Sequence, residues 1–180
     1  MGNCADRRIC VLPIIVRWRF LRTSRSFARV APIRQAGTIS AQPFRMTPHE
    51  LRERTKGFAI SIVRVCREVP RRWDIRVIGG QLLRSGTGVA SNYRASCRAR
   101  SDREFCAKIG VVVEEADESQ LWLELLIEAY PRVRTQEYQR LTREAAELTA
   151  IFTASHRTAK ANLRKRAVDR ARKRGQRPSP

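Results

Sequence analysis

The sequence lacks the cysteine pattern of a disulfide scaffold or a zinc site. Its five cysteines are an odd number, and no two of them form a C-x-x-C pair. Cys66, Cys97 and Cys106 fall within helical patterns. We therefore expect them to be small buried or half-buried residues in the reducing environment of a cytoplasm.

The sequence also has little that could perform catalysis. Its two histidines, His49 and His156, are far apart in the chain, and neither stands in a motif with a serine or cysteine. The carboxylates between residues 114 and 118 have no histidine at the spacing used by di-iron bundles. We expect no enzyme activity, no cofactor and no metal.

Long apolar runs are absent. The longest candidate, residues 9–16, is followed by Arg17 and Arg19 and is much shorter than the ~20 residues that a membrane span needs. We therefore expect no membrane partner.

Acidic residues are scarce at both ends of the chain. Residues 1–46 hold nine Lys and Arg against one acid, and residues 132–180 hold 14 against four, whereas residues 47–131 hold 14 against 12. The net charge of +20 thus lies mainly in the flanks. A near-neutral middle with basic ends is typical of a protein that meets a polyanion such as nucleic acid. A solvated tail that binds nothing specific is the alternative.

Residues 1–46 have no sustained hydrophobic period and are rich in Arg and Ser. This composition fits an organellar transit peptide or a disordered basic arm. Met46 stands directly before a predicted helix start, so translation beginning at Met46 is a third interpretation. We assign the segment no structure and treat it as a disordered or mis-called extension.

The middle of the chain has four apolar seams at helical spacing. The first helix is predicted over residues 48–68, because Thr47 can act as N-cap, Pro48 suits the first helical position and Glu50 completes a capping box. Ser101 and Glu104 are expected to form the same box before the third helix, 102–130. The apolar seams are Leu51, Thr55, Phe58, Ile62, Val65 and Val69; Ile75, Ile78, Leu82, Val89 and Tyr93; Phe105, Ile109, Val112, Ala116, Ser119, Leu123, Leu126 and Tyr130; and Tyr138, Leu141, Ala145, Leu148, Phe152, Ser155 and Ala159.

Each of these helices needs partners for its seam. We predict an all-α protein, an antiparallel up-down-up-down four-helix bundle over residues 47–160. Disordered basic extensions are expected at both ends. The fourth helix is predicted to fray into a basic C-terminal tail over residues 161–180.

The second predicted helix contains four glycines, Gly79, Gly80, Gly86 and Gly88. Each costs up to ~1 kcal/mol relative to alanine in a helix interior. We interpret them as points where a neighbouring element approaches closely. A phosphate-binding loop is disfavoured, because the run lacks a G-K-[ST] ending and a preceding strand.

Apolar residues in the third helix exceed what one seam requires. Leu121, Trp122 and Leu125 lie off the main stripe. With only four helices to cover them, they are predicted to form a subunit interface.

Basic residues suggest where a polyanion would bind. We predict phosphate contacts, which carry no sequence information, around the second connection and on the first helix. No aromatic stacking platform is evident, so binding is expected to depend on shape and charge. The predicted nucleic-acid-binding residues are Arg52, Lys56, Arg64, Arg94, Arg98, Arg100 and Arg103.

Three motifs carry a resemblance to a known family: the run over residues 81–94 (QLLRSGTGVASNYR), Phe105 with Lys108-Ile109-Gly110, and the run over 115–126 (EADESQLWLELL). Together, over residues 50–155, they resemble the bacterial four helix bundle proteins first noticed as reading frames in intervening sequences of 23S rRNA genes. They are similar also to the accessory variability protein of diversity-generating retroelements.

The resemblance implies a bundle that assembles into a ring-like homopentamer with a basic face. For the retroelement relatives it implies binding of nucleic acid and of a reverse transcriptase. Ala95 departs from the family pattern, which typically has Glu after Asn-Tyr-Arg. Most members of the family have no assigned biochemical role.

Two functions follow as hypotheses. The first is a non-catalytic, oligomeric bundle that binds RNA or DNA backbones through basic surface residues. The alternative is a protein-interaction scaffold for a retroelement reverse transcriptase or another acidic partner.

Overall fold

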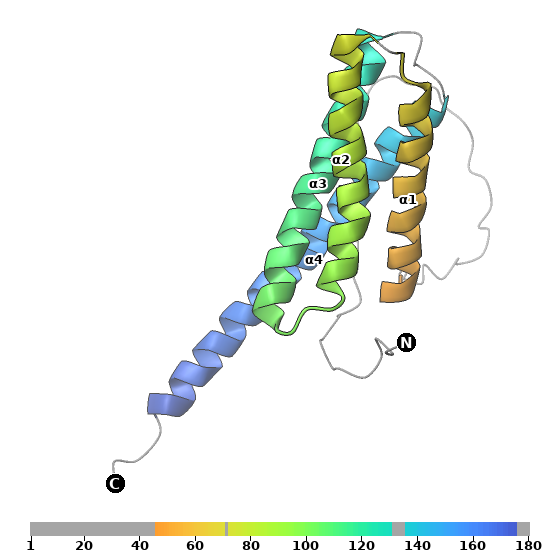
Figure 1. The fold of residues 1–180 in the computed structure, drawn as a ribbon. Helices are drawn as coiled ribbons and strands as arrows, with labels where there is room; N and C mark the ends of the chain where they lie inside the picture. Colours follow the sequence, from red (N-terminus) through yellow and green to blue (C-terminus); the bar gives the residue numbers. More distant parts are fainter. Residues whose placement is uncertain (1–45, 71, 131–135, 176–180) are drawn as a thin grey trace, which may run out of the picture.

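The computed structural model describes residues 46–70, 72–130 and 136–175. These residues form four helices: α1 (Pro48–Glu68), α2 (Trp73–Ser96), α3 (Asp102–Ala129) and α4 (Gln136–Gly175). Successive helices run in opposite directions and pack side by side (Figure 1). The predicted all-α, up-down-up-down bundle is confirmed. The expectations for residues 1–45, for the connection at 131–135 and for residues 176–180 lie outside the described residues.

The start of α1 follows the prediction. The Glu50 backbone N–H donates to Thr47 Oγ1 at 3.2 Å, and the Thr47 N–H donates to Glu50 Oε2 at 2.6 Å. This reciprocal capping box, with Pro48 at the first helical position, begins the helix. The backbone N–H of Thr47 also lowers the pKa of the Glu50 carboxyl, because hydrogen bonds favour its charged form.

The four seams meet in one core. Ile62 of α1, Leu82 of α2, Leu123 of α3 and Phe152 of α4 are all fully buried. Tyr138 is also buried, and its hydroxyl donates to the Val65 carbonyl at 3.1 Å, which satisfies its one polar group. The heptad pattern therefore identified the residues that bury one another.

Two of the four glycines of α2, Gly86 and Gly88, serve close packing as predicted, whereas Gly79 and Gly80 do not. A Cβ at Gly86 would lie 2.8 Å from Cγ1 and Cγ2 of Ile62, so α1 approaches α2 at a point where only glycine fits. A Cβ at Gly88 would lie 2.6 Å from the carboxyl of Glu115 on α3. Gly79 makes only ordinary contact with Val69, and Gly80 has nothing within 4 Å. All four lie inside a helix, which leaves no place for a phosphate-binding loop.

The start of α3 differs in part from the prediction. Ser101 Oγ accepts from the Glu104 N–H at 3.1 Å, as a cap should. The Glu104 side chain, however, accepts from the backbone N–H of Arg100 at 2.8 Å rather than from Ser101. The carboxylate reaches one residue further back, where it also meets the Arg100 guanidinium. The hydrogen bond from the Arg100 backbone lowers the pKa of Glu104.

The fourth helix is longer than expected. Residues 161–175, predicted as an extension of the fourth helix that frays into a basic tail, are helical throughout and belong to α4, which has 40 residues. The reason is local, because Ala, Leu, Arg and Lys dominate this stretch and no glycine or proline interrupts it before Gly175. Figure 1 shows this part of α4 running past the end of the bundle.

Candidate nucleic-acid interface

One end of the bundle collects the connection between α2 and α3, the first turn of α1 and the outgoing part of α4 (Figure 1). The Tyr93 hydroxyl lies 3.5 Å from the Pro48 carbonyl, which joins the end of α2 to the start of α1. The guanidinium of Arg166 forms an ion pair with Asp102, which joins α4 to the first residue of α3. We call this region the basic end.

Four of the seven predicted nucleic-acid-binding residues meet at the basic end. Arg94 lies in the last turn of α2, Arg98 and Arg100 lie in the connection, and Arg103 lies in the first turn of α3. All four are exposed. Proximity in sequence was enough to group them, because the connection is short.

The predicted residues on α1 divide between the two ends. Arg52 and Lys56 lie in the first turns of α1, at the basic end, where Arg52 is half-buried and Lys56 is paired with Glu53 at 3.5 Å. Arg64 is exposed but lies more than two turns further along α1. The structure therefore does not bring Arg64 to the same surface.

The seven predicted nucleic-acid-binding residues include none of the cations of α4. Residues 157–172 contain seven Lys or Arg and a single acid, Asp169. The sequence shows this run of charges and predicts a basic tail, but it does not show where the tail lies relative to the bundle. The structure places it on a helix that leaves the bundle beside the connection; its cations are Arg157, Lys160, Arg164, Lys165, Arg166, Arg170 and Arg172.

Most of these cations have no carboxylate partner among the described residues. Arg100 pairs with Glu104 at 3.4 Å, and Arg166 pairs with Asp102. No other ion pair of the described chain involves an arginine of the connection or a cation of the outgoing part of α4. Unpaired cations are free to exchange their water and counterions for phosphates.

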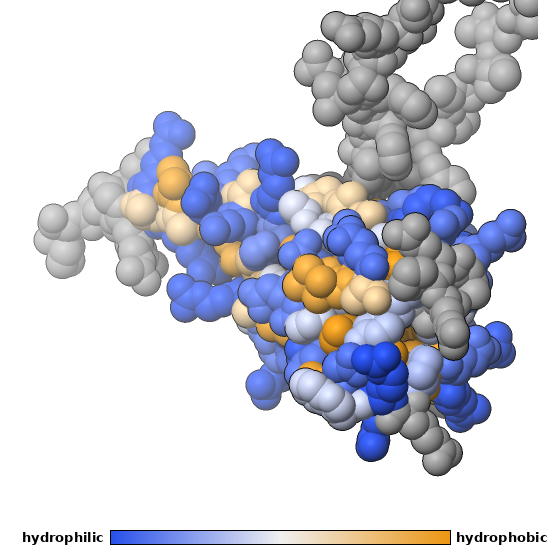
Figure 2. Space-filling view, turned by 90° about the horizontal axis from the view of Figure 1, so that it is seen from above, coloured by the Kyte–Doolittle hydropathy of each residue, from blue (hydrophilic) through white to orange (hydrophobic). Residues whose placement is uncertain are grey.

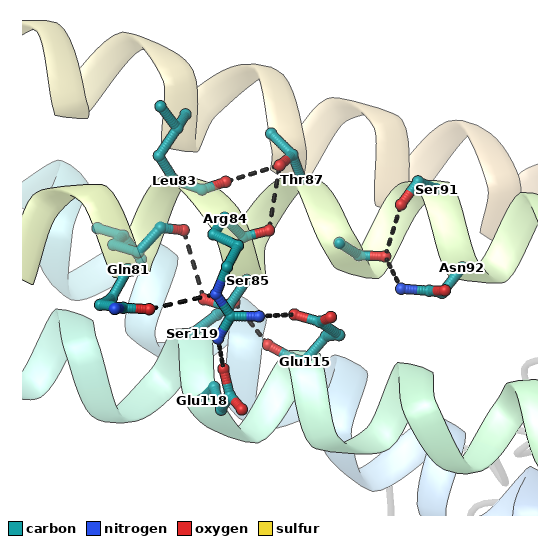
Figure 3. Close-up of polar contacts among 12 residues, drawn as sticks. Gln81, Leu83, Arg84, Ser85, Thr87, Ser91, Asn92, Glu115, Glu118 and Ser119 are labelled. Atoms are coloured by element: carbon teal, nitrogen blue, oxygen red, sulfur yellow. Dashed lines mark hydrogen bonds and ion pairs between the residues drawn. The ribbon is translucent and has the colours of Figure 1, made fainter.

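Two acidic residues in the middle of α3 form ion pairs with α2. Arg84 of α2 forms ion pairs with Glu115 and Glu118 of α3 (Figure 3). In the buried contact between the same two helices, Ser119 Oγ lies 3.0 Å from Ser85 Oγ, so a polar contact also joins α2 and α3. These contacts hold α2 against α3.

Burial explains the pKa of Glu115. Its Oε2 is buried without a hydrogen-bond partner in the described chain and lies 3.6 Å from the guanidinium of Arg84. Desolvation raises the pKa of this carboxyl, and the charge of Arg84 offsets only part of the effect.

The three predicted interface residues lie toward the opposite end of α3. Leu121 is 48% exposed and Leu125 is 37% exposed. Trp122 packs partly against the core, and its indole N–H is buried without a partner among the described residues. Trp73 and Val77 of α2 are also exposed nearby, where the Tyr130 hydroxyl donates to Asp74 at 2.5 Å. Figure 2, seen onto this end, shows apolar surface between hydrophilic side chains.

The described chain offers little to other chemistry. It contains no group of three or more His, Cys, Asp or Glu that could hold a metal ion. Burial raises the pKa of the Cys66 thiol to about 11, which keeps it in the unreactive protonated form. His156 is half-buried over Gly110 rather than on an open surface. Within the described segments, no helix has both the length and the apolarity that crossing a bilayer requires.

Comparison with known proteins identifies the family. Residues 49–154 match the family described as 23S rRNA-intervening sequence protein. The chain belongs to this family.

A solved structure supports the assignment. It is a protein of unknown function from the S23 ribosomal protein family of Bacteroides thetaiotaomicron, and it is 26% identical to this 23S rRNA-intervening sequence family member. The similar region covers 62% of this chain and 99% of that one, with a TM-score of 0.57. No curated protein matches the chain. The matched family region stops at residue 154, so the basic part of α4 lies beyond it.

Proposed function

We propose that this 23S rRNA-intervening sequence family member is a non-catalytic, oligomeric bundle that binds the backbone of nucleic acids through its basic end. The observation that carries the proposal is the gathering of cations without ion-pair partners, from the α2–α3 connection and from α4, at one end of the described chain. The reducing cytoplasm expected from the cysteines is the compartment of this proposed activity.

The chemistry of the basic end favours charge over base recognition. Arg and Lys release condensed counterions when they neutralise phosphates, and this release supplies most of the affinity. Among the described residues, the aromatic side chains at this end do not form a platform, since Tyr93 is buried and Phe105 is half-buried. Binding is therefore expected to fall steeply with salt and to depend little on sequence.

The test is a fluorescence-anisotropy titration of the full chain against structured RNA and duplex DNA. Between about 50 and 200 mM salt, affinity is expected to fall by at least about tenfold for three or more phosphate contacts. A triple variant, Arg94→Gln, Arg98→Gln and Arg103→Gln, is expected to weaken binding by about tenfold.

A matched control tests whether position matters or only net charge. Arg67→Gln, Arg76→Gln and Arg143→Gln remove the same charge from exposed, unpaired arginines toward the other end of the described bundle. The control should keep most of the affinity. Equal losses in both triple variants, or affinity that ignores salt, would discard the basic end as the binding site.

A second candidate is a protein-interaction scaffold, for which the exposed apolar residues Leu121 and Leu125 give specific support. In this case an oligomer, a pentamer by family resemblance, would hold an acidic partner such as a retroelement reverse transcriptase. Removing residues 1–45 and 161–180 separates the two functions. A scaffold should keep its partner, whereas a binder that depends on basic extensions should lose most of its affinity for nucleic acid.

A further inference from the structure

We infer that the outgoing part of α4 enters the major groove of a B-form DNA duplex, while the arginines of the connection contact the flanking phosphates. This inference rests on the proposed function and names the class of nucleic acid. It is carried by the way in which α4 leaves the bundle and by the distribution of its cations around the helix.

The contacts of α4 with the bundle end before its last turns. Phe152 is its last fully buried residue, and His156 still packs over Gly110 of α3. Arg166 pairs with Asp102, the first residue of α3, so α3 offers no helix beyond this level. Every side chain from Arg164 to Arg172 is exposed. The end of α4 is thus a free rod whose direction is fixed at its base.

The cations of the outgoing part of α4 are distributed around the helix. Residues seven apart in a helix lie on nearly the same side, and residues four apart lie close to it. The cations therefore form three stripes: Arg157 with Arg164, flanked by Lys160; Lys165 with Arg172; and Arg166 with Arg170. Arg166 is held by Asp102 of α3, but beyond this pair Arg170 and Arg172 lie about 200° apart around the helix, so the free rod carries positive charge on opposite sides.

A helix with cations on opposite sides fits a groove better than a flat surface. A flat array of phosphates meets only one side of a rod and would leave the other stripes repelling one another in water. The B-DNA major groove is about 12 Å wide, and a helix with its side chains is about 10–12 Å across. Both strands then pass the helix, one on each flank, so that stripes on opposite sides meet phosphates at the same time.

The A-form duplex does not offer such a groove. The major groove of double-stranded RNA is deep and narrow, and side chains cannot read it. A rod that is basic on opposite sides therefore fits B-form DNA better than double-stranded RNA of the same sequence.

The position of the connection agrees with this docking. Arg98 and Arg103 are exposed beside Asp102, next to the base of the free rod. When a helix lies in the groove, residues at its base face the sugar-phosphate backbone that borders the groove. The two groups of cations thus have separate tasks, one inside the groove and one on its rim.

The experiment compares three probes with the full chain: a 20-base-pair DNA duplex, an RNA duplex of the same sequence, and one strand of the DNA, with affinities expected to differ by about tenfold in favour of the DNA duplex.

The decisive variant is Ala167→Pro, which breaks the exposed rod and changes no charge. Ala167→Ser is its control. Because residue 167 lies beyond the core, melting of the bundle should stay the same in both variants.

Ala167→Pro is expected to reduce affinity for the DNA duplex to about that for the single strand, whereas Ala167→Ser should not. Netropsin, which fills the minor groove, should leave binding unchanged. Equal affinity for all three probes, a normal Ala167→Pro variant or displacement by netropsin would overturn the groove inference while nucleic-acid binding itself remained. Absence of binding to every probe would instead overturn the proposed function.

Discussion

Two glycines of α2, two residues apart in the sequence, pack against different helices. Gly86 faces Ile62 of α1, and Gly88 faces the carboxyl of Glu115 on α3. The cost of an added methyl group depends on whether that neighbour can move. Ile62 is fully buried and fixed by the core, whereas the Glu115 carboxyl is the end of a flexible side chain.

Gly86→Ala is therefore expected to destabilise the protein by about 1–3 kcal/mol, because it overpacks a filled core. Gly80→Ala is the matched control. It has open space around it, and it should stabilise α2 by up to about 1 kcal/mol. Urea unfolding followed by circular dichroism measures both. A Gly86→Ala variant as stable as Gly80→Ala would contradict the close approach of α1 and α2.

The raised pKa of Glu115 predicts how the stability of the protein changes with pH. Burial raises its pKa in the folded state, so the folded protein holds this proton more tightly than the unfolded chain. The stability contributed by protonated Glu115 is present at low pH and is lost as the pH rises through the raised pKa. Glu115→Gln should therefore be more stable than the parent at about pH 7, and the difference should shrink toward about pH 4.

Urea unfolding at several pH values tests this expectation, with Glu128→Gln as the control. Glu128 is exposed on the same helix and has no ion pair among the described residues, so its replacement should change little at either pH. A Glu115→Gln variant that is less stable near neutral pH would show that the ion pair with Arg84 outweighs desolvation.

At the scale of elements, an ion-pair cluster joins α1 to α4. Arg54 of α1 donates from Nε to Glu144 Oε1 at 2.6 Å and from Nη2 to Glu144 Oε2 at 2.8 Å, and Glu147 lies 2.5 Å from the same guanidinium. The hydrogen bonds to Glu144 raise the pKa of Arg54, so the group stays charged throughout the accessible range. This contact closes the bundle between its first and last helices.

Arg54→Gln should lower the free energy of unfolding by about 1 kcal/mol, since a bidentate, partly buried pair is worth more than an exposed one. Lys56→Gln, one half-turn away, removes an exposed pair with Glu53 and should cost less than about 0.5 kcal/mol. Chemical denaturation at low and high salt separates them. Equal effects of the two substitutions would show that the Arg54–Glu144 ion pair stabilises the fold no more than an exposed ion pair does.

At the scale of the whole molecule, the two ends of the described bundle differ in character. The basic end carries unpaired cations, and the other end exposes Leu121, Leu125 and Trp73. Because the two surfaces lie at different ends, one could hold further subunits while the other holds a polyanion. The proposed oligomer and the proposed nucleic-acid binding are therefore compatible in one molecule.

Replacing Leu121 and Leu125 together by Glu should lower the molecular mass measured by sedimentation equilibrium. Both side chains are exposed in the single chain, so charge there should disturb contacts between subunits more than the fold. Leu83→Glu on α2, with 38% exposure, is the control. An unchanged mass for the double variant would remove these residues from the proposed interface.

The seams of α1 to α4, the Thr47 cap and the packing role of Gly86 were predictable from the sequence. These features depend on the spacing of residues within one helix or on the size and conformation of a single residue. Residues close together in the sequence are enough to determine them. The reach of Glu104 back to Arg100 was missed, because a cap's partner depends on the path of the connection. Arg64 was grouped with Arg52 because both lie on α1, although they lie near different ends.

By itself, the sequence determined the number of helices, their core-facing residues and the excess of charge at the ends of the chain. Only the tertiary structure decided that the cations of α4 lie beside those of the α2–α3 connection, at the end where α4 leaves the bundle. The physical reason is that periodicity fixes the side of a helix on which a residue lies. The surface that it shares with residues far away in the chain depends on how the helices pack.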